Sequence, residues 1–227
     1  MVRSQSMSEF RRGLLVRFAR FSAPATAVLV FCARRRSRSL VTLRTIARAR
    51  DHVLLTPQGG EPERFDEVVL ATHSDQALAL LAEPTDIERR LLGSLRYQDN
   101  EAVLHTDAAM LPRRRRAWAS WNYHLLADPG ERATVTYHMN RLQSLRAERE
   151  FCVTLNRTEA IDPSRIIRRI AYAHPVYTPA GVAAQARVAE ITGHNRTHFC
   201  GAYWGWGFHE DGVVSAERVA VRLGASS

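Results

Sequence analysis

The chain has 227 residues, and 45% of them are hydrophobic, so it can bury a core in one large domain or two small ones. The charged fraction of 24% is ordinary for a folded protein, and Gly and Pro are too few to indicate disorder. The three cysteines, Cys32, Cys152 and Cys200, are far apart and form no CxxC pair. The composition therefore argues against a disulfide framework, predicts no metal site, and favours a reducing cytoplasm.

The net charge of +9 is concentrated at one end of the chain. Residues 1–50 contain 12 arginines and a single acid, Glu9, whereas the remaining residues carry 20 basic and 22 acidic groups. Because the body of the chain is nearly neutral, its charge predicts no nucleic-acid partner.

The Arg-rich leader, residues 1–50, is predicted to stand outside the fold. Its one apolar run, residues 23–33, is too short to span a bilayer, so the sequence predicts no transmembrane segment. An Arg cluster follows this run in place of a small-residue cleavage site, which argues against a secretory signal. Two alternatives remain open. The leader could be an organelle transit peptide, or it could be a disordered or non-native segment that a misread start or a frameshift has produced. We favour the disordered or non-native segment. The leader could also make peripheral membrane contact through its charge.

The body begins with elements of alternating type. An unbroken apolar run at Val68–Ala71 indicates a buried strand. Thr85 or Asp86 is a typical N-cap for a helix. The predicted elements are a strand at 52–56, a turn at 57–62, a strand at 65–72, a helix from Ser74 and a second helix from Thr85 or Asp86.

The middle of the chain is rich in Val, Thr, Trp and Tyr and predicts strands. Four consecutive arginines, Arg113–Arg116, fall between two of them, and we interpret these as a solvated turn. The predicted strands are 101–106, 117–124, 133–139, 151–155 and 170–173.

The last part predicts a helix at Pro179–Ile191, a strand at 197–201, an aromatic loop, and a helix at Val213–Leu223. The start of a helix offers unpaired amides and a partial positive charge, which suit an anionic or electron-rich ligand. Gly212 would let the backbone approach that ligand closely. The alternative is a buried loop whose Trp and Tyr side chains only fill the core.

This stretch resembles the C-terminal flavin motif of FAD-dependent amine-oxidase-like proteins. There a strand ends in Ala-Gly or a close variant, and an aromatic loop leads into an acid, a Gly, an Ala and a Val or Ile at the start of a helix. The matching residues are Cys200-Gly201-Ala202-Tyr203 and Gly207-Phe208-His209-Glu210-Asp211-Gly212-Val213-Val214-Ser215-Ala216.

Earlier segments extend the resemblance over roughly residues 51–224. Residues 65–72 are similar to the family's strand that returns from the substrate region into the FAD-binding sheet. His73–Leu78 is similar to bacterial members described as predicted NAD/FAD-binding proteins. The same subgroup is matched by Trp118–His124, Met139–Gln143, Phe151–Asn156 and Ala173–Pro179.

The resemblance implies an FAD cofactor, a small-molecule substrate of unknown identity, and hydride transfer from that substrate to flavin. It assigns no catalytic residue. The cofactor-binding residues that it implies are Ala71, Thr72, Gly201, Glu210, Asp211, Gly212 and Val213, of which Glu210 to Val213 would act through backbone atoms. Candidates for the substrate side of the flavin are Tyr203, Trp204, Trp206, Phe208 and His209.

Two departures from the family qualify this expectation. The chain has no GxGxxG, the turn that binds the pyrophosphate of FAD, and Ala202 and Tyr203 replace the acid that many relatives carry after Gly201. A truncated, non-catalytic fragment that cannot bind FAD by itself is therefore the alternative function.

The expected fold class is α/β or α+β, with part of a Rossmann-type FAD-binding region beside a mostly antiparallel substrate sheet. Residues 51–85 and 180–227 would form the FAD-binding part. Residues 86–179 would form the substrate part.

Overall fold

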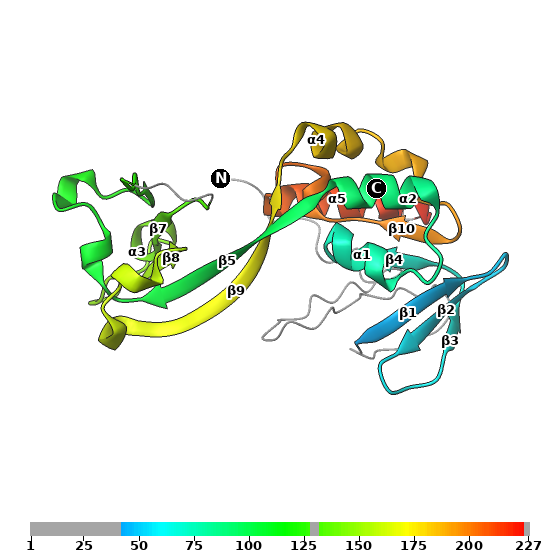
Figure 1. The fold of residues 1–227 in the computed structure, drawn as a ribbon, viewed down its shortest axis with the longest axis horizontal. Helices are drawn as coiled ribbons and strands as arrows, with labels where there is room; N and C mark the ends of the chain where they lie inside the picture. The colour runs from blue at the N-terminus through cyan, green and yellow to red at the C-terminus, as the bar shows by residue number, and fades with distance from the viewer. Residues whose placement is uncertain (1–41, 128–131, 225–227) are drawn as a thin grey trace. The chain divides into compact units, whose positions relative to one another are not determined.

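The computed structural model describes residues 42–127 and 132–224 (Figure 1). The chain divides into two compact units. Unit 1 runs to Arg96 and resumes at Pro175, and unit 2 comprises Tyr97–His174. From the sequence we expect boundaries at 85/86 and 179/180, with an FAD-binding part outside them and a substrate part between them.

Unit 1 begins with a three-stranded antiparallel sheet in the order β1-β2-β3. The strands are β1 at Leu43–Arg48, β2 at Val53–Pro57 and β3 at Glu63–Phe65. β1 lies within residues 1–50, so the expectation that this whole segment stands outside the fold is wrong for residues 43–48. Ile46 is 1% exposed, which shows that β1 contributes to the core. Residues 1–41 lie outside the described part of the chain.

A buried ion pair fixes β1 to helix α2, which spans Asp86–Ser94. Arg48 Nη1 lies 2.5 Å from Glu88 Oε1, and its Nη2 lies 2.9 Å from Oε2. Thr85 is the N-cap of α2, as predicted, and its amide donates to the Glu88 carboxylate at 2.7 Å. Burial raises the pKa of Glu88, but the hydrogen bonds from Arg48 and Thr85 outweigh it and leave this pKa lowered.

Two short parallel strands form the second sheet of unit 1. β4 spans Val68–Leu70 and pairs with β10 at Thr197–Phe199, with Phe199 opposite Leu70. The single strand predicted at 65–72 is therefore two strands, β3 and β4, which belong to different sheets.

Helices contribute the rest of the core of unit 1. The predicted helix at 179–191 is shorter, because α4 ends at Gln185 and only a 3-10 turn follows. The α-helices besides α2 are α1 at Ser74–Leu80, α4 at Pro179–Gln185 and α5 at His209–Arg222.

Unit 2 contains a five-stranded sheet in the order β6-β7-β8-β5-β9. The pairings β6–β7, β7–β8 and β5–β8 are antiparallel. The strands are β5 at Arg96–His105, β6 at Trp121–Tyr123, β7 at Val135–His138, β8 at Cys152–Leu155 and β9 at Ile166–Val176, and helix α3 is the short segment Met139–Leu142.

Short 3-10 turns complete the chain. One of them, Arg115–Ala117, includes the first residue of the strand predicted at 117–124, and the observed strand begins only at Trp121. The others are Ala108–Met110, Thr158–Ala160, Pro163–Arg165, Val188–Glu190 and Ala202–Trp204.

The architecture is α+β with mostly antiparallel sheets, as predicted. Within residues 42–127 and 132–224, no helix combines the length and the apolar character needed to cross a membrane.

Candidate functional site

The predicted cofactor residues come together in unit 1, where two parallel strands end. Ala71 and Thr72 follow β4, and Gly201 follows β10. The strands are paired up to this point, because the Cys200 amide donates to the Leu70 carbonyl at 3.0 Å. The carboxyl ends of adjacent parallel strands are where open α/β sheets bind their ligands.

Helix α5 begins beside the end of β10. The Gly201 amide donates to Ser215 Oγ at 3.1 Å. A Cβ built on Gly212 would lie 3.8 Å from the Ala202 Cβ, an ordinary van der Waals distance. The protein's own packing therefore has room for a methyl group at Gly212.

The start of α5 differs from the prediction. The helix begins at His209 rather than at Val213, with Phe208 as its N-cap. The Gly212 amide donates to the Phe208 carbonyl at 3.3 Å, and the Val213 amide lies in the helix interior. The amides without an acceptor inside the helix are those of His209, Glu210 and Asp211. Gly212 and Val213 are therefore not amide donors to a ligand at this helix end.

The Asp211 carboxylate holds the aromatic loop against the helix. Its Oδ2 accepts the amide of Phe208 at 2.9 Å and the amide of Trp206 at 3.0 Å. A Cβ on Gly205 would lie 2.4 Å from Asp211 Oδ1, so this position requires glycine. The prediction gave Asp211 only a backbone role. The available signal was an acid three residues after the N-cap, as in a capping box.

Gln185, at the end of α4, fixes the same loop from the other side. Its Nε2 donates to the carbonyls of Tyr203 at 2.9 Å and Gly205 at 2.5 Å. Gln185 was not predicted from the sequence, because its partners are 18 and 20 residues away and no local pattern indicates such a contact.

The five aromatic and His candidates for the substrate side separate into two groups. Tyr203 and Trp204 are buried and belong to the core cluster of unit 1, so they do not lie on an open face. Trp206 and Phe208 are 61% and 63% exposed, and His209 is exposed.

Tyr177 extends this exposed face. Its ring lies 5.5 Å from that of Trp206, tilted by 51°. A Cβ on Gly207, whose φ is +84°, would lie 2.6 Å from Tyr177 Oη, so both the backbone and the space require glycine there. Burial, and after it the negative charge of Asp211, raises the pKa of Tyr177.

A buried donor near the end of β10 lacks a partner. Trp204 Nε1 has no hydrogen-bond acceptor among the described residues. A buried Trp N–H usually has one, so this atom is available to an acceptor that the described residues do not supply.

Unit 2 contains a separate cavity of about 520 Å³. None of the predicted site residues lines it. Its lining residues are Glu101, Leu126, Arg132, Thr134, Asn156, Thr158 and Glu159. Over the described ranges, no group of three or more His, Cys, Asp or Glu side chains could hold a metal ion.

No protein-family model matches the sequence, and no curated protein does. A fatty acid isomerase from P. acnes, described as CLA-producing, matches 85% of this chain and 49% of its own, with a TM-score of 0.56 and 14% identity. The chain has an amine-oxidase-like fold.

Two oxidases match with similar scores. Putrescine oxidase, solved bound to putrescine, has a TM-score of 0.51 and 11% identity over 81% of this chain and 48% of its own. Cyclohexylamine oxidase from Brevibacterium oxydans has a TM-score of 0.50 and 14% identity over 81% of this chain and 49% of its own. The chain spans about half the length of these solved proteins, and identities this low establish the fold alone.

Proposed function

We propose that this chain is part of an FAD-dependent oxidoreductase in which the start of α5 meets the flavin ring and an unidentified small molecule donates a hydride. The observation that carries the proposal is the arrangement in unit 1. The amides of His209, Glu210 and Asp211 begin a helix of 14 residues beside the carboxyl ends of β4 and β10. Unpaired amides at such a helix end bind groups that carry negative charge.

The residues present fit the ring of a flavin. Gly212 has no side chain to obstruct a flat ring, and Trp204 Nε1 is a free buried donor in the same region. When bound, a flavin supplies hydride and electron transfer. The amides and the positive end of α5 would stabilise negative charge at the pyrimidine edge of the reduced ring. Ala71, Thr72 and Gly201 would lie against the ring from the strand ends.

The fit does not extend to the ADP half of FAD. The 227 residues contain no GxGxxG to bind a pyrophosphate. The proposal therefore concerns the ring, and it assigns no residue to the phosphates.

The exposed aromatic face gives this site a place for substrate. Trp206, Phe208 and Tyr177 would contact an apolar part of the substrate and exclude water from the reacting carbon. Asp211 acts as a positioning residue, since its carboxylate holds the amides of Trp206 and Phe208.

We propose a cytoplasmic location because the described cysteines are free thiols. Cys152 and Cys200 are free and buried. Burial raises the pKa of Cys152 to about 12 and that of Cys200 to about 11, so both remain protonated and unreactive. Free thiols are typical of a reducing compartment.

Gly212→Ala tests the proposal with Gly93→Ala as its matched control. Both glycines lie within helices, and a Cβ at Gly93 meets nothing within 4 Å. Each substitution should leave the fold intact and stabilise its helix by up to about 1 kcal/mol. Only the methyl at residue 212 would stand between α5 and a bound ring.

The measurement is titration of the full chain with FAD and with FMN, followed by flavin fluorescence and by the visible spectrum after gel filtration. Wild type and Gly93→Ala should bind flavin equally, and Gly212→Ala should bind at least about tenfold more weakly, which corresponds to 1.4 kcal/mol. A colourless wild type that ignores both flavins, or a Gly212→Ala variant that binds as tightly as wild type, would contradict the proposal.

A further inference from the structure

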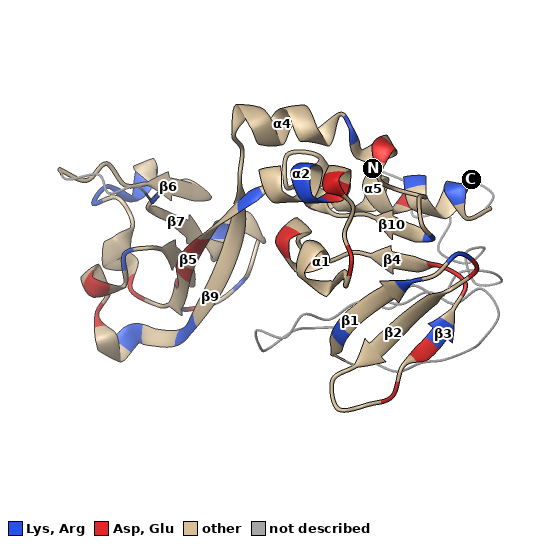
Figure 2. Ribbon diagram, turned by 45° about the vertical axis from the view of Figure 1, so that its right-hand side comes forward, with Lys and Arg blue, Asp and Glu red and all other residues tan. Residues whose placement is uncertain are grey.

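Unit 2 presents exposed arginines on two segments that the proposed flavin site does not use. One segment is residues 113–116, and the other is residues 141–149, which begins within α3. Figure 2 colours the arginines blue and the acids red along the ribbon. Over residues 113–118 and 139–150 the chain carries seven arginines against two acids, Glu148 and Glu150. Within the described residues, no carboxylate pairs with Arg113, Arg114, Arg116, Arg141, Arg146 or Arg149.

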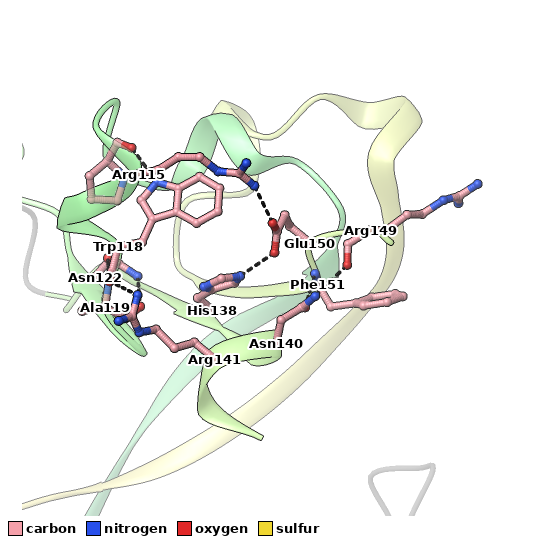
Figure 3. Close-up of polar contacts among 11 residues, drawn as sticks. Arg115, Trp118, Ala119, Asn122, His138, Asn140, Arg141, Arg149, Glu150 and Phe151 are labelled. Atoms are coloured by element: carbon pink, nitrogen blue, oxygen red, sulfur yellow. Dashed lines mark hydrogen bonds and ion pairs between the residues drawn. The ribbon is translucent and has the colours of Figure 1, made fainter. Parts of the chain in front are cut away.

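A set of exposed and part-buried contacts links the two segments (Figure 3). Glu150 accepts from Arg115 Nη2 at 2.8 Å and lies 2.7 Å from His138 Nε2. The Arg115 guanidinium lies 4.8 Å above the centre of the Trp118 ring, and Arg141 Nη1 donates to the Trp118 carbonyl at 2.8 Å. These contacts connect residues 113–118 to residues 138–150.

Apolar side chains are exposed on the same segments. Leu142 and Leu145 are 44% and 41% exposed, and they are flanked in sequence by Arg141 and Arg146. Exposed leucines among basic residues are typical of surfaces that lie on membranes, where the leucines reach the acyl chains and the cations reach the headgroups. A solvated turn accounts for the arginines of 113–116 but gives no reason for the exposed leucines.

We propose that this surface, defined as Arg113, Arg114, Arg116, Arg141, Leu142, Leu145, Arg146 and Arg149, docks on an anionic phospholipid bilayer. The guanidinium groups would bind phosphate and carboxylate groups of the lipids, and the two leucines would enter the boundary of the acyl region. Nucleic acid shares the negative charge but offers no apolar layer for aliphatic side chains.

Vesicle co-sedimentation of the full chain tests this surface. The test variant carries Arg113→Gln, Arg114→Gln and Arg116→Gln. The control carries Arg90→Gln, Arg168→Gln and Arg169→Gln, which are exposed, remove the same charge, and lie outside this surface. The full chain is used in each case because β1 lies within residues 1–50.

Wild type and the control should bind phosphatidylcholine vesicles that contain phosphatidylserine, and bind pure phosphatidylcholine vesicles far less. The test variant should bind the anionic vesicles at least about tenfold more weakly, since each basic residue near such a surface contributes about fivefold. Leu142→Ser with Leu145→Ser should also weaken binding while keeping all charges.

Three outcomes would overturn the proposal. The first is an equal loss of binding in the test and control variants, which would assign the effect to net charge or to residues 1–50. The second is unchanged binding after the two leucine substitutions. The third is retention of a DNA or RNA duplex, but not of anionic vesicles, by the wild-type chain.

Discussion

Among its described residues, unit 1 encloses a cluster of 17 buried hydrophobic side chains. In the part of unit 2 that the structure describes, the corresponding cluster consists of Val103, Met110 and Ile161. Much of the interior of unit 2 is polar instead, with His105, Thr136 and Thr154 all fully buried. Apolar burial depends little on pH, whereas a polar interior is stable only while each donor faces an acceptor. The two units should therefore respond differently to the same perturbations.

A chain of hydrogen bonds runs through the interior of unit 2. His105 Nε2 lies 2.8 Å from Thr154 Oγ1, which lies 2.8 Å from Thr136 Oγ1. Thr136 Oγ1 in turn lies 2.7 Å from His124 Nε2.

Contacts at the two ends of this hydrogen-bond chain determine which ring nitrogen of each histidine carries the proton. The Asp107 amide donates to His105 Nδ1 at 3.1 Å, and Arg157 donates to His124 Nδ1 at 2.7 Å. Both Nδ1 atoms are thus acceptors, so each neutral imidazole carries its proton on Nε2 and donates it to a threonine. Burial lowers the pKa of both histidines, and the positive charge of Arg157 lowers that of His124 further.

The largest effect is expected from the apolar core of unit 1. Phe199, in β10, is 1% exposed. Phe199→Ala should lower the free energy of unfolding by about 3–5 kcal/mol, because it removes buried apolar surface and leaves a cavity. Phe208→Ala, at a 63% exposed position, should change it by less than about 0.5 kcal/mol. Urea denaturation measures both, and similar losses would refute the assignment of Phe199 to the core.

Breaking the buried ion pair between Arg48 and Glu88 should lower the free energy of unfolding by about 3 kcal/mol or more. Arg48→Met leaves the Glu88 carboxylate buried without its partner. The control is Arg64→Met, which removes the partner of Asp51 from a solvent-exposed pair of 2.6 Å and should cost far less. Equal losses in urea denaturation would show that Arg48 and Glu88 are solvated.

A hydroxyl deletion probes the polar interior of unit 2 directly. Thr154→Val keeps the shape of the side chain but strands the Nε2–H of His105, so it should cost about 1–3 kcal/mol. Thr154→Ser retains the hydroxyl and should cost less than Thr154→Val. If the valine variant is as stable as wild type, the hydrogen-bond chain does not stabilise unit 2.

Acidification should weaken unit 2 through its histidines. Their folded pKa values lie below the unfolded value of about 6.5, so stability is full above that pH and is lost as the pH falls towards the folded pKa values. Each histidine contributes at most about 1.4 kcal/mol per pH unit. His124→Gln should reduce the loss measured by urea denaturation between about pH 7.5 and about pH 5.5.

A companion variant separates the two units in that experiment. In unit 1, burial lowers the pKa of His198, Arg222 adds to this, and Glu67 opposes it. His198→Gln should therefore remove the contribution of unit 1 to the loss of stability at low pH, and keep the contribution of unit 2. An identical pH dependence in wild type and both variants would mean that other groups cause the acid sensitivity.

Local signals predicted the elements that local interactions form. Thr85 caps α2 as its sequence position indicates, and the apolar run at Val68–Ala71 gives the buried strand β4. The order of β10, the aromatic loop and α5 also followed from the sequence.

Long-range and irregular features were not predictable in this way. β1 was missed because it contains Arg44 and Arg48 and lies at the end of the Arg-rich residues 1–50, which the composition placed outside the fold. The start of α5 was misplaced because Gly212 resembles a helix opening, whereas the Asp211 side chain secures the first turn at His209. The burial of Tyr203 and Trp204 depends on packing against distant segments, which the aromatic pattern of the loop does not report.

The position of β1 has a practical consequence for any shortened form of the protein. In the sheet order β1-β2-β3, removing residues 1–50 would make the central strand β2 an edge strand. Its backbone would then offer unsatisfied N–H and C=O groups, and the side chains of Val53 and Leu55 would lose cover. Such an edge pairs readily with other chains, so a protein begun at residue 51 should aggregate more than the full chain does.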